Sequence, residues 1–156
     1  MRGLIIGAGL AGLLAAAPLL PAPAHAAGMR SAKDLRRLNI MLMVTSLRCR
    51  ATRSDFRRDY TRFTVRHRKS LNLAHRQLTT QLAKRHGAAG ASRKLDRMSV
   101  HIANSYGRGH PWLDCRNLRK VTRNLARLKD RGDLAHAARQ MLSRRRPARF
   151  AYAGKR

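Results

Sequence analysis

The sequence feature that most constrains the fold is the run LNIMLMVTSL, from Leu38 to Leu47, which is apolar on nearly every side of a helix. A helix of this kind is normally enclosed by other helices, because no side of it is polar enough to face water. We therefore expect a largely apolar central helix over residues 31–49, the first helix of the fold. Ser31 and Asp34, three residues apart, resemble a capping box at its start.

Apolar residues at three- and four-residue steps predict the remaining elements. From Phe56 to Leu82 they form one stripe, with Ser54 suited to start that helix and Gly87 suited to end it. A helix of this length is long enough to kink or break. No strand pattern is present, so we expect an all-α bundle of four to five helices. The later helices are expected over 91–106, 115–128 and 134–141, the last two capped by Asp114 and Asp133.

The opening of the chain contains GAGLAG at residues 7–12, which matches the G-x-G-x-x-G pattern of dinucleotide-binding loops. Such a loop needs a following helix and a second strand, but prolines interrupt this segment and no strand pattern follows. A short positive start, an uncharged apolar stretch over 4–20 and the sequence Ala24-His25-Ala26 are instead typical of a secretory signal peptide. We therefore expect cleavage after Ala26.

The predicted organisation has three parts: a cleaved signal peptide over 1–26, one helical domain over 27–142, and a mobile, disordered basic tail over 143–156. The tail, SRRRPARFAYAGKR, has no helical period. After cleavage, no segment is apolar enough to span a bilayer. The expected location is the periplasm or the extracellular medium.

The chain has two cysteines, Cys49 and Cys115. In an exported chain an even pair favours one disulfide, since the compartment is oxidising. The closed loop of roughly 65 residues would contribute about 4 kcal/mol of stability in the loop-entropy model. Two buried free thiols are the alternative, whereas a metal site needs more ligands at close spacing.

Charge is the second strong constraint, because 35 Lys and Arg residues face seven acids and give a net charge of +28. Such a surface attracts polyanions, through counterion release and through bidentate contacts of Arg with phosphate. A solvated charged surface without a selected partner is the alternative. The candidate anion-binding residues lie on the predicted fourth helix and in the tail: Arg116, Arg119, Lys120, Arg123, Arg127, Arg144, Arg145, Arg146 and Arg149.

No catalytic constellation stands out, so no cofactor, metal or catalytic residue is expected and the sequence favours a non-enzymatic role. His67 lies on the apolar stripe and is expected to be a half-buried structural residue. His110 is expected to pack within its loop beside Trp112. Asp55 and Asp59, each flanked by Arg, are expected to be solvated ion-pair partners rather than paired catalytic carboxylates.

Three stretches, LRRLNIMLMVTSLRCR, RHGAAGASRKLDRMSVHIAN and YGRGHPWLDC, resemble a family of short exported two-cysteine helical proteins of alphaproteobacteria. The resemblance covers most of residues 31–142 and implies export, helical content and pairing of Cys49 with Cys115. It implies no catalytic residues, since that family has no assigned activity. Chains of this kind are sometimes labelled S-adenosylhomocysteine hydrolases. Those enzymes are several times longer and hold NAD in a Rossmann domain, whereas the G-x-G-x-x-G here lies in the predicted signal peptide.

Three functions remain open from the sequence. The first is a non-enzymatic exported protein that binds anionic surfaces such as lipopolysaccharide, phospholipid headgroups or nucleic acid. The second is a periplasmic stress or chaperone-like factor that uses the Met-rich helix as an apolar surface. The third is a small hydrolase, which would need His110 and Asp114 to converge in a cleft.

Overall fold

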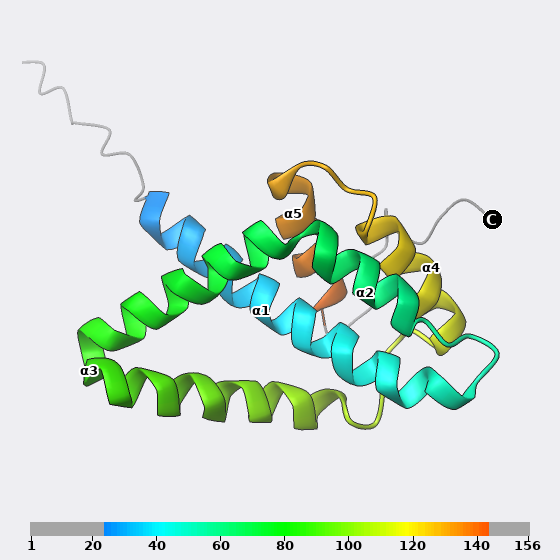
Figure 1. Ribbon diagram of the computed structural model, residues 1–156, viewed down its shortest axis with the longest axis horizontal. Helices are drawn as coiled ribbons and strands as arrows, with labels where there is room; N and C mark the ends of the chain where they lie inside the picture. Colours follow the sequence, from blue (N-terminus) through cyan, green and yellow to red (C-terminus); the bar gives the residue numbers. More distant parts are fainter. Residues whose placement is uncertain (1–23, 144–156) are drawn as a thin grey trace, which may run out of the picture.

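The computed structural model describes residues 24–143, and this part of the chain is all α-helical, with turns and no strand. Five α-helices follow one another, with one short 3₁₀ segment after the first (Figure 1). Their bounds are α1 Ala24–Arg48, α2 Arg57–Arg66, α3 Arg68–Tyr106, α4 Cys115–Leu125 and α5 Arg131–Met141, and the 3₁₀ segment is Cys49–Ala51. The predicted all-α bundle is confirmed.

Helix α1 is the centre of the fold, as its apolar run predicts, and it contacts each of the other four helices. The side chains of Leu35, Leu38, Met41 and Leu42 are fully buried. Thr45 is also buried, and its hydroxyl donates to the Met41 carbonyl oxygen at 2.7 Å, so the polar group is satisfied inside the helix. The central position of α1 therefore follows from the absence of a polar face.

Helix α3 forms a V with its apex at Gly87, and α1 runs across it (Figure 1). Gly87 has φ 68° and ψ 171°, which interrupts the helical backbone between the arms 68–86 and 88–106. Arg36 of α1 contacts both arms: its Nη2 donates to Ser99 Oγ at 2.7 Å, and its Nη1 donates to His75 Nδ1 at 3.3 Å. Each arm is thereby fixed against the central helix.

Some helix limits differ from the prediction. Residues 24–30 are already helical, so Ser31 lies within α1 and not at its start, and the predicted capping box is absent. The single helix expected after Ser54 begins only at Arg57 and breaks at His67, where φ −100° and ψ 14° separate α2 from α3. The tertiary hydrogen bond made by His67 accompanies this break.

Of the two N-caps predicted for the last two helices, one is confirmed and the other is wrong. Asp114 caps α4 as predicted, since its carboxylate accepts the backbone N–H of Asn117 at 2.8 Å. The predicted cap of α5, Asp133, is wrong. Asp130 holds that position and accepts the backbone N–H groups of Gly132 and Asp133. Because Asp130, three residues earlier, accepts both backbone N–H groups, the helix starts before Asp133, which lies in its first turn.

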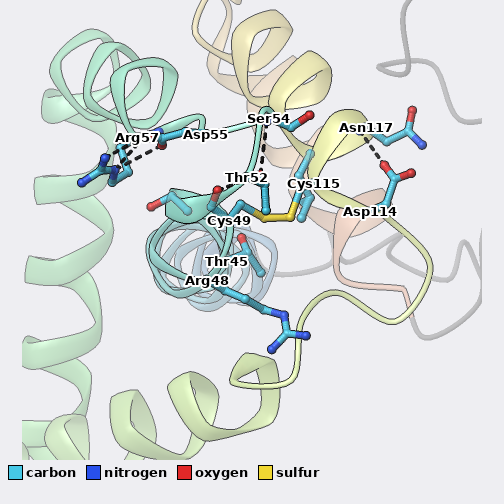
Figure 2. Close-up of a disulfide and its surroundings, with 12 residues drawn as sticks. Thr45, Arg48, Cys49, Thr52, Ser54, Asp55, Arg57, Asp114, Cys115 and Asn117 are labelled. Carbon is cyan, nitrogen blue, oxygen red and sulfur yellow. Dashed lines mark hydrogen bonds and ion pairs between the residues drawn. A yellow bond between two sulfur atoms is a disulfide. The ribbon is translucent and has the colours of Figure 1, made fainter.

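The predicted disulfide is present and joins Cys49, just after α1, to Cys115, the first residue of α4 (Figure 2). The two residues are 66 positions apart, and Cys49 is buried. The bond therefore fixes the end of the central helix to the start of α4. A disulfide is typical of proteins in an oxidising compartment.

Two parts of the predicted organisation fall outside the described residues. The proposed signal peptide over 1–26 lies almost wholly before Ala24, and the basic tail over 143–156 lies outside the described residues apart from Ser143. Within the described part, no helix has both the length and the apolar character needed to cross a bilayer.

Candidate anion-binding surface between α2 and α4

Helices α2 and α4 pack against each other through apolar side chains on their facing sides. Phe63 of α2 is fully buried, as are Val121 and Leu125 of α4. The Thr122 hydroxyl, buried in the same layer, donates to the Leu118 carbonyl oxygen at 2.7 Å. This apolar contact brings the arginine-bearing sides of the two helices together at one edge.

Asp59 of α2 is the electrostatic centre of that edge. Its side chain is only 6 % exposed and lies among arginines from both helices. Arg123 Nε of α4 lies 3.3 Å from Asp59 Oδ1, and Arg119 Nε lies 3.8 Å from Oδ2. Arg62 Nη1, one turn along α2, lies 3.4 Å from Oδ1. The expectation that Asp59 is solvated is wrong, because packing of α4 on α2 covers it.

Asp55 behaves as a solvated ion-pair partner, as the sequence predicts. Its Oδ2 lies 2.7 Å from Arg57 Nη2, and its Oδ1 accepts the Arg57 backbone N–H at 3.0 Å (Figure 2). These hydrogen bonds lower the pKa of Asp55 to about 2. The carboxylate therefore stays ionised and orders the first turn of α2.

Around these ion pairs the surface forms an open hollow of about 620 Å³. Five arginines and two aspartates line it: Asp55, Arg57, Arg58, Asp59, Arg62, Arg119 and Arg123. The lining thus carries three positive charges in excess. Arg119 approaches Asp59 through Nε, and Arg123 donates to both carboxylate oxygens through Nε and Nη2, which orders these guanidinium groups at the rim. Ordered guanidinium groups are suited to bidentate contacts with phosphate or sulfate.

The predicted anion-binding residues divide into three groups. Arg119 and Arg123 line the hollow and pair with Asp59. Arg116 and Lys120 are exposed on α4, whereas Arg127 is exposed just beyond it, because α4 ends at Leu125 and not near residue 128 as predicted. The four tail residues lie outside the described residues: Arg144, Arg145, Arg146 and Arg149.

The contribution of α2 to this surface was not predicted. Arg57, Arg58 and Arg62 line the hollow, although the sequence favoured α4 and the tail. A signal was available, since Arg58 and Arg62 are four residues apart and fall opposite the apolar stripe. The sequence did not indicate that α2 packs against α4, because this contact depends on tertiary packing and not on a local pattern.

His67 is a structural residue, as predicted, and is more deeply buried than expected, with 6 % exposure. Its Nε2 donates to the Leu125 carbonyl oxygen at 2.8 Å and so links the α2–α3 junction to α4. Burial lowers the pKa of His67; Arg66 lowers it further, while the hydrogen bond to Leu125 opposes the shift. The neutral imidazole is the form that fits this position.

His110 packs in its loop, as predicted, and both of its ring nitrogens are engaged. Nε2 donates to the Met141 carbonyl oxygen at 2.8 Å, and Nδ1 accepts the Trp112 backbone N–H at 3.4 Å. Burial lowers the pKa of His110, partly opposed by the bond to Met141. Asp114 is engaged as the cap of α4. These contacts give His110 and Asp114 separate structural roles.

Across the described residues, no three His, Cys, Asp or Glu side chains gather in a way that could hold a metal ion. The fold and this surface together define a small, disulfide-bonded, all-α protein with a cationic hollow between two helices. Comparison with models of known families, with curated proteins and with solved structures finds no match. The resemblance to the alphaproteobacterial family therefore stays a prediction.

Proposed function

We propose that this is an exported, non-catalytic protein that binds anionic polymers or membrane surfaces through the α2–α4 surface. The observation that carries the proposal is the concentration of five arginines around one hollow, three of them paired with the buried Asp59. Exposed Arg116 and Lys120 extend the positive surface along α4, and exposed Arg127 follows the end of that helix. Phosphate is the shared chemistry of the expected partners: lipopolysaccharide, phospholipid headgroups and nucleic acid.

Export follows from the predicted signal peptide and agrees with the disulfide, which persists in an oxidising compartment. We propose that residues 1–26 are removed and that the protein acts in the periplasm or outside the cell. Mass spectrometry of the exported protein tests this directly. The expected mass is that of residues 27–156 less two hydrogens; a mass that includes residues 1–26 would contradict the proposal.

Salt dependence is the sharpest test of polyanion binding. We expect tight binding to lipopolysaccharide, to vesicles containing anionic phospholipid and to duplex DNA, with affinity that falls steeply as salt rises. Vesicles of phosphatidylcholine alone are the uncharged comparison. Release from all three anionic ligands near physiological salt would overturn the proposal, and the order of affinities among them identifies the source of phosphate.

A matched pair of variants then locates the surface. Arg58→Gln, Arg116→Gln and Lys120→Gln together remove three exposed charges from α2 and α4. The control variant combines Arg76→Gln, Arg93→Gln and Lys94→Gln on α3, which removes the same charge at other exposed positions. For DNA we expect the first variant to reduce the slope of log affinity against log salt by about 2.7, since each phosphate contact contributes about 0.9. Equal effects of the two variants would mean that net charge, and not this surface, drives binding.

The chaperone-like alternative has one supporting observation. Met43 and Leu47, four residues apart on α1, are 39 % and 50 % exposed. Most of the Met-rich run serves the core instead, since Met41 and Leu42 are fully buried. Replacement of both exposed residues by Gln in an aggregation assay with an unfolding client tests this function separately from anion binding.

A further inference from the structure

A second hollow, of about 790 Å³, lies away from the α2–α4 surface. Its volume falls within the range of roughly 300–1,000 Å³ typical of small-molecule sites. Three regions form it: the first part of α1, the end of α3 with the loop after it, and the residues that end α5. This hollow has a different composition from the first, because apolar side chains form part of its lining.

The rim of the hollow is cationic. Arg30, Lys33 and Arg37 are at three- and four-residue steps on α1, so they share one side of that helix. Arg108 lies on the loop after α3. Asp34 is the one carboxylate in the lining, and burial raises its pKa, although Arg37, Arg139 and Arg30 lower it. Four cations against one carboxylate leave a clear excess of positive charge.

Apolar side chains form part of the lining, together with these cations and the polar residues His101 and Ser105. Ile102 and Tyr106 of α3 are 5 % and 7 % exposed, and Met98 lies one turn before them. Leu142, directly after α5, completes the apolar part of the lining. The pKa of Tyr106 is raised by burial and lowered in part by Arg37, which places a cation beside this aromatic side chain. Apolar and cationic groups therefore adjoin each other.

Two hydrogen bonds fix one side of the hollow, where the loop after α3 meets the residues at the end of α5. His110 Nε2 donates to the Met141 carbonyl oxygen at 2.8 Å, and Trp112 Nε1 donates to the Ser143 carbonyl oxygen at 2.8 Å. Both bonds join the loop after α3 to the end of α5. The site is thus formed before any ligand arrives, which reduces the entropy cost of binding.

We propose that this hollow binds a single-chain anionic amphiphile, that is, an alkyl chain that ends in a phosphate or carboxylate. A charged polymer would make no use of the half-buried side chains of Met98 and Leu142, and an uncharged lipid would leave the cations without a partner. An amphiphilic anion contacts both, with its head group at Lys33, Arg37 and Arg108 and its chain along Met98 and Leu142. This site is separate from the α2–α4 surface and does not depend on polyanion binding.

Fluorescence of Trp112, the single tryptophan, reports on this site because its indole bonds to Ser143 in the lining. The probes are dodecyl phosphate and laurate, each below its critical micelle concentration. Dodecyl maltoside supplies the chain without charge, and inorganic phosphate supplies charge without the chain. We expect saturable binding of the two anionic amphiphiles at least about tenfold tighter than of either control. Equal affinity for dodecyl maltoside would overturn the proposal, and the ratio of the two anionic probes identifies the head group.

Variants of the lining residues test whether the ligand binds in this hollow. Lys33→Gln with Arg108→Gln should weaken dodecyl phosphate binding by about tenfold, and Met98→Gln should weaken it as well. Lys84→Gln with Arg85→Gln removes the same charge at exposed positions on the first arm of α3 and should leave binding unchanged. The triple variant of the α2–α4 surface should also leave it unchanged, so failure of one proposal is distinguishable from failure of the other. Equal weakening by both double variants would contradict the assignment of this hollow.

Discussion

Arg123 of α4 places its Nε 3.3 Å from Oδ1 of Asp59 in α2, and thus links two helices whose residues are 64 positions apart in the chain. Asp59 is nearly inaccessible to solvent, whereas Arg123 remains 42 % exposed. The carboxylate therefore orders arginines that still face the hollow. One residue stabilises the packing of α2 on α4 and also reduces the positive charge available to a ligand.

Replacement of Asp59 by Asn should have two opposite effects. Loss of the buried carboxylate should reduce the free energy of unfolding by about 1–2 kcal/mol, a value limited by the solvent exposure of the arginines. The same change adds one net positive charge to the hollow and should strengthen polyanion binding by about threefold. Urea unfolding and salt-dependent binding measure the two effects.

Asp96→Asn serves as the matched control for this variant, because it removes one carboxylate at an exposed position on α3. We expect a smaller loss of stability and no local gain in binding. If Asp59→Asn left polyanion binding in the folded protein unchanged, as expected for Asp96→Asn, the hollow would not be the binding surface.

The sequence alone was sufficient to predict the features that depend on one helix only. The run around Met41 predicted a central α1, and Asp114 predicted the start of α4, because each depends on local pattern. The sequence alone did not predict the features that depend on contact between two helices. Burial of Asp59 depends on the arginines that α4 brings to it, and no periodicity within α2 reveals that partner. The V of α3 was anticipated only as a helix end at Gly87.

Gly87→Ala should destabilise the protein. Gly87 has φ 68° and ψ 171°, a backbone conformation that a side chain with Cβ adopts only with strain. The expected cost is about 1–3 kcal/mol in urea unfolding. Gly28→Ala is the control, because its added Cβ meets no atom within 4 Å. An equal response of the two variants would show that the apex of α3 does not require this conformation.

Acidification should destabilise the protein through His67 and His110. Burial lowers the pKa of both histidines in the folded state, so the unfolded chain takes up protons first as pH falls. Their contribution to stability is complete above the ordinary histidine pKa of about 6.5 and is lost as pH falls through the lowered values. Urea unfolding at pH of about 7.5 and about 5.5 measures the loss.

A double variant tests whether His67 and His110 cause this dependence of stability on pH. His67→Gln with His110→Gln keeps an N–H donor near each carbonyl oxygen and removes the titration. We expect it to be less stable than the wild type near pH 7.5 but to change less between the two pH values. A wild type equally stable at both values would contradict the expected burial of neutral imidazoles.

Loss of the Cys49–Cys115 disulfide should destabilise the fold more than any of these substitutions. The bond closes a loop of 66 residues, and in the loop-entropy model its removal costs about 4 kcal/mol. Cys49→Ser with Cys115→Ser should therefore shift urea unfolding to lower concentration, and reductant should shift the wild type but not the variant. Because Cys115 is the first residue of α4, we also expect the folded variant to bind polyanions more weakly, as the helix that carries Arg119 and Arg123 loses its covalent link to the core. Unfolding of the wild type that is unchanged by complete reduction of the disulfide would contradict this assignment of stability.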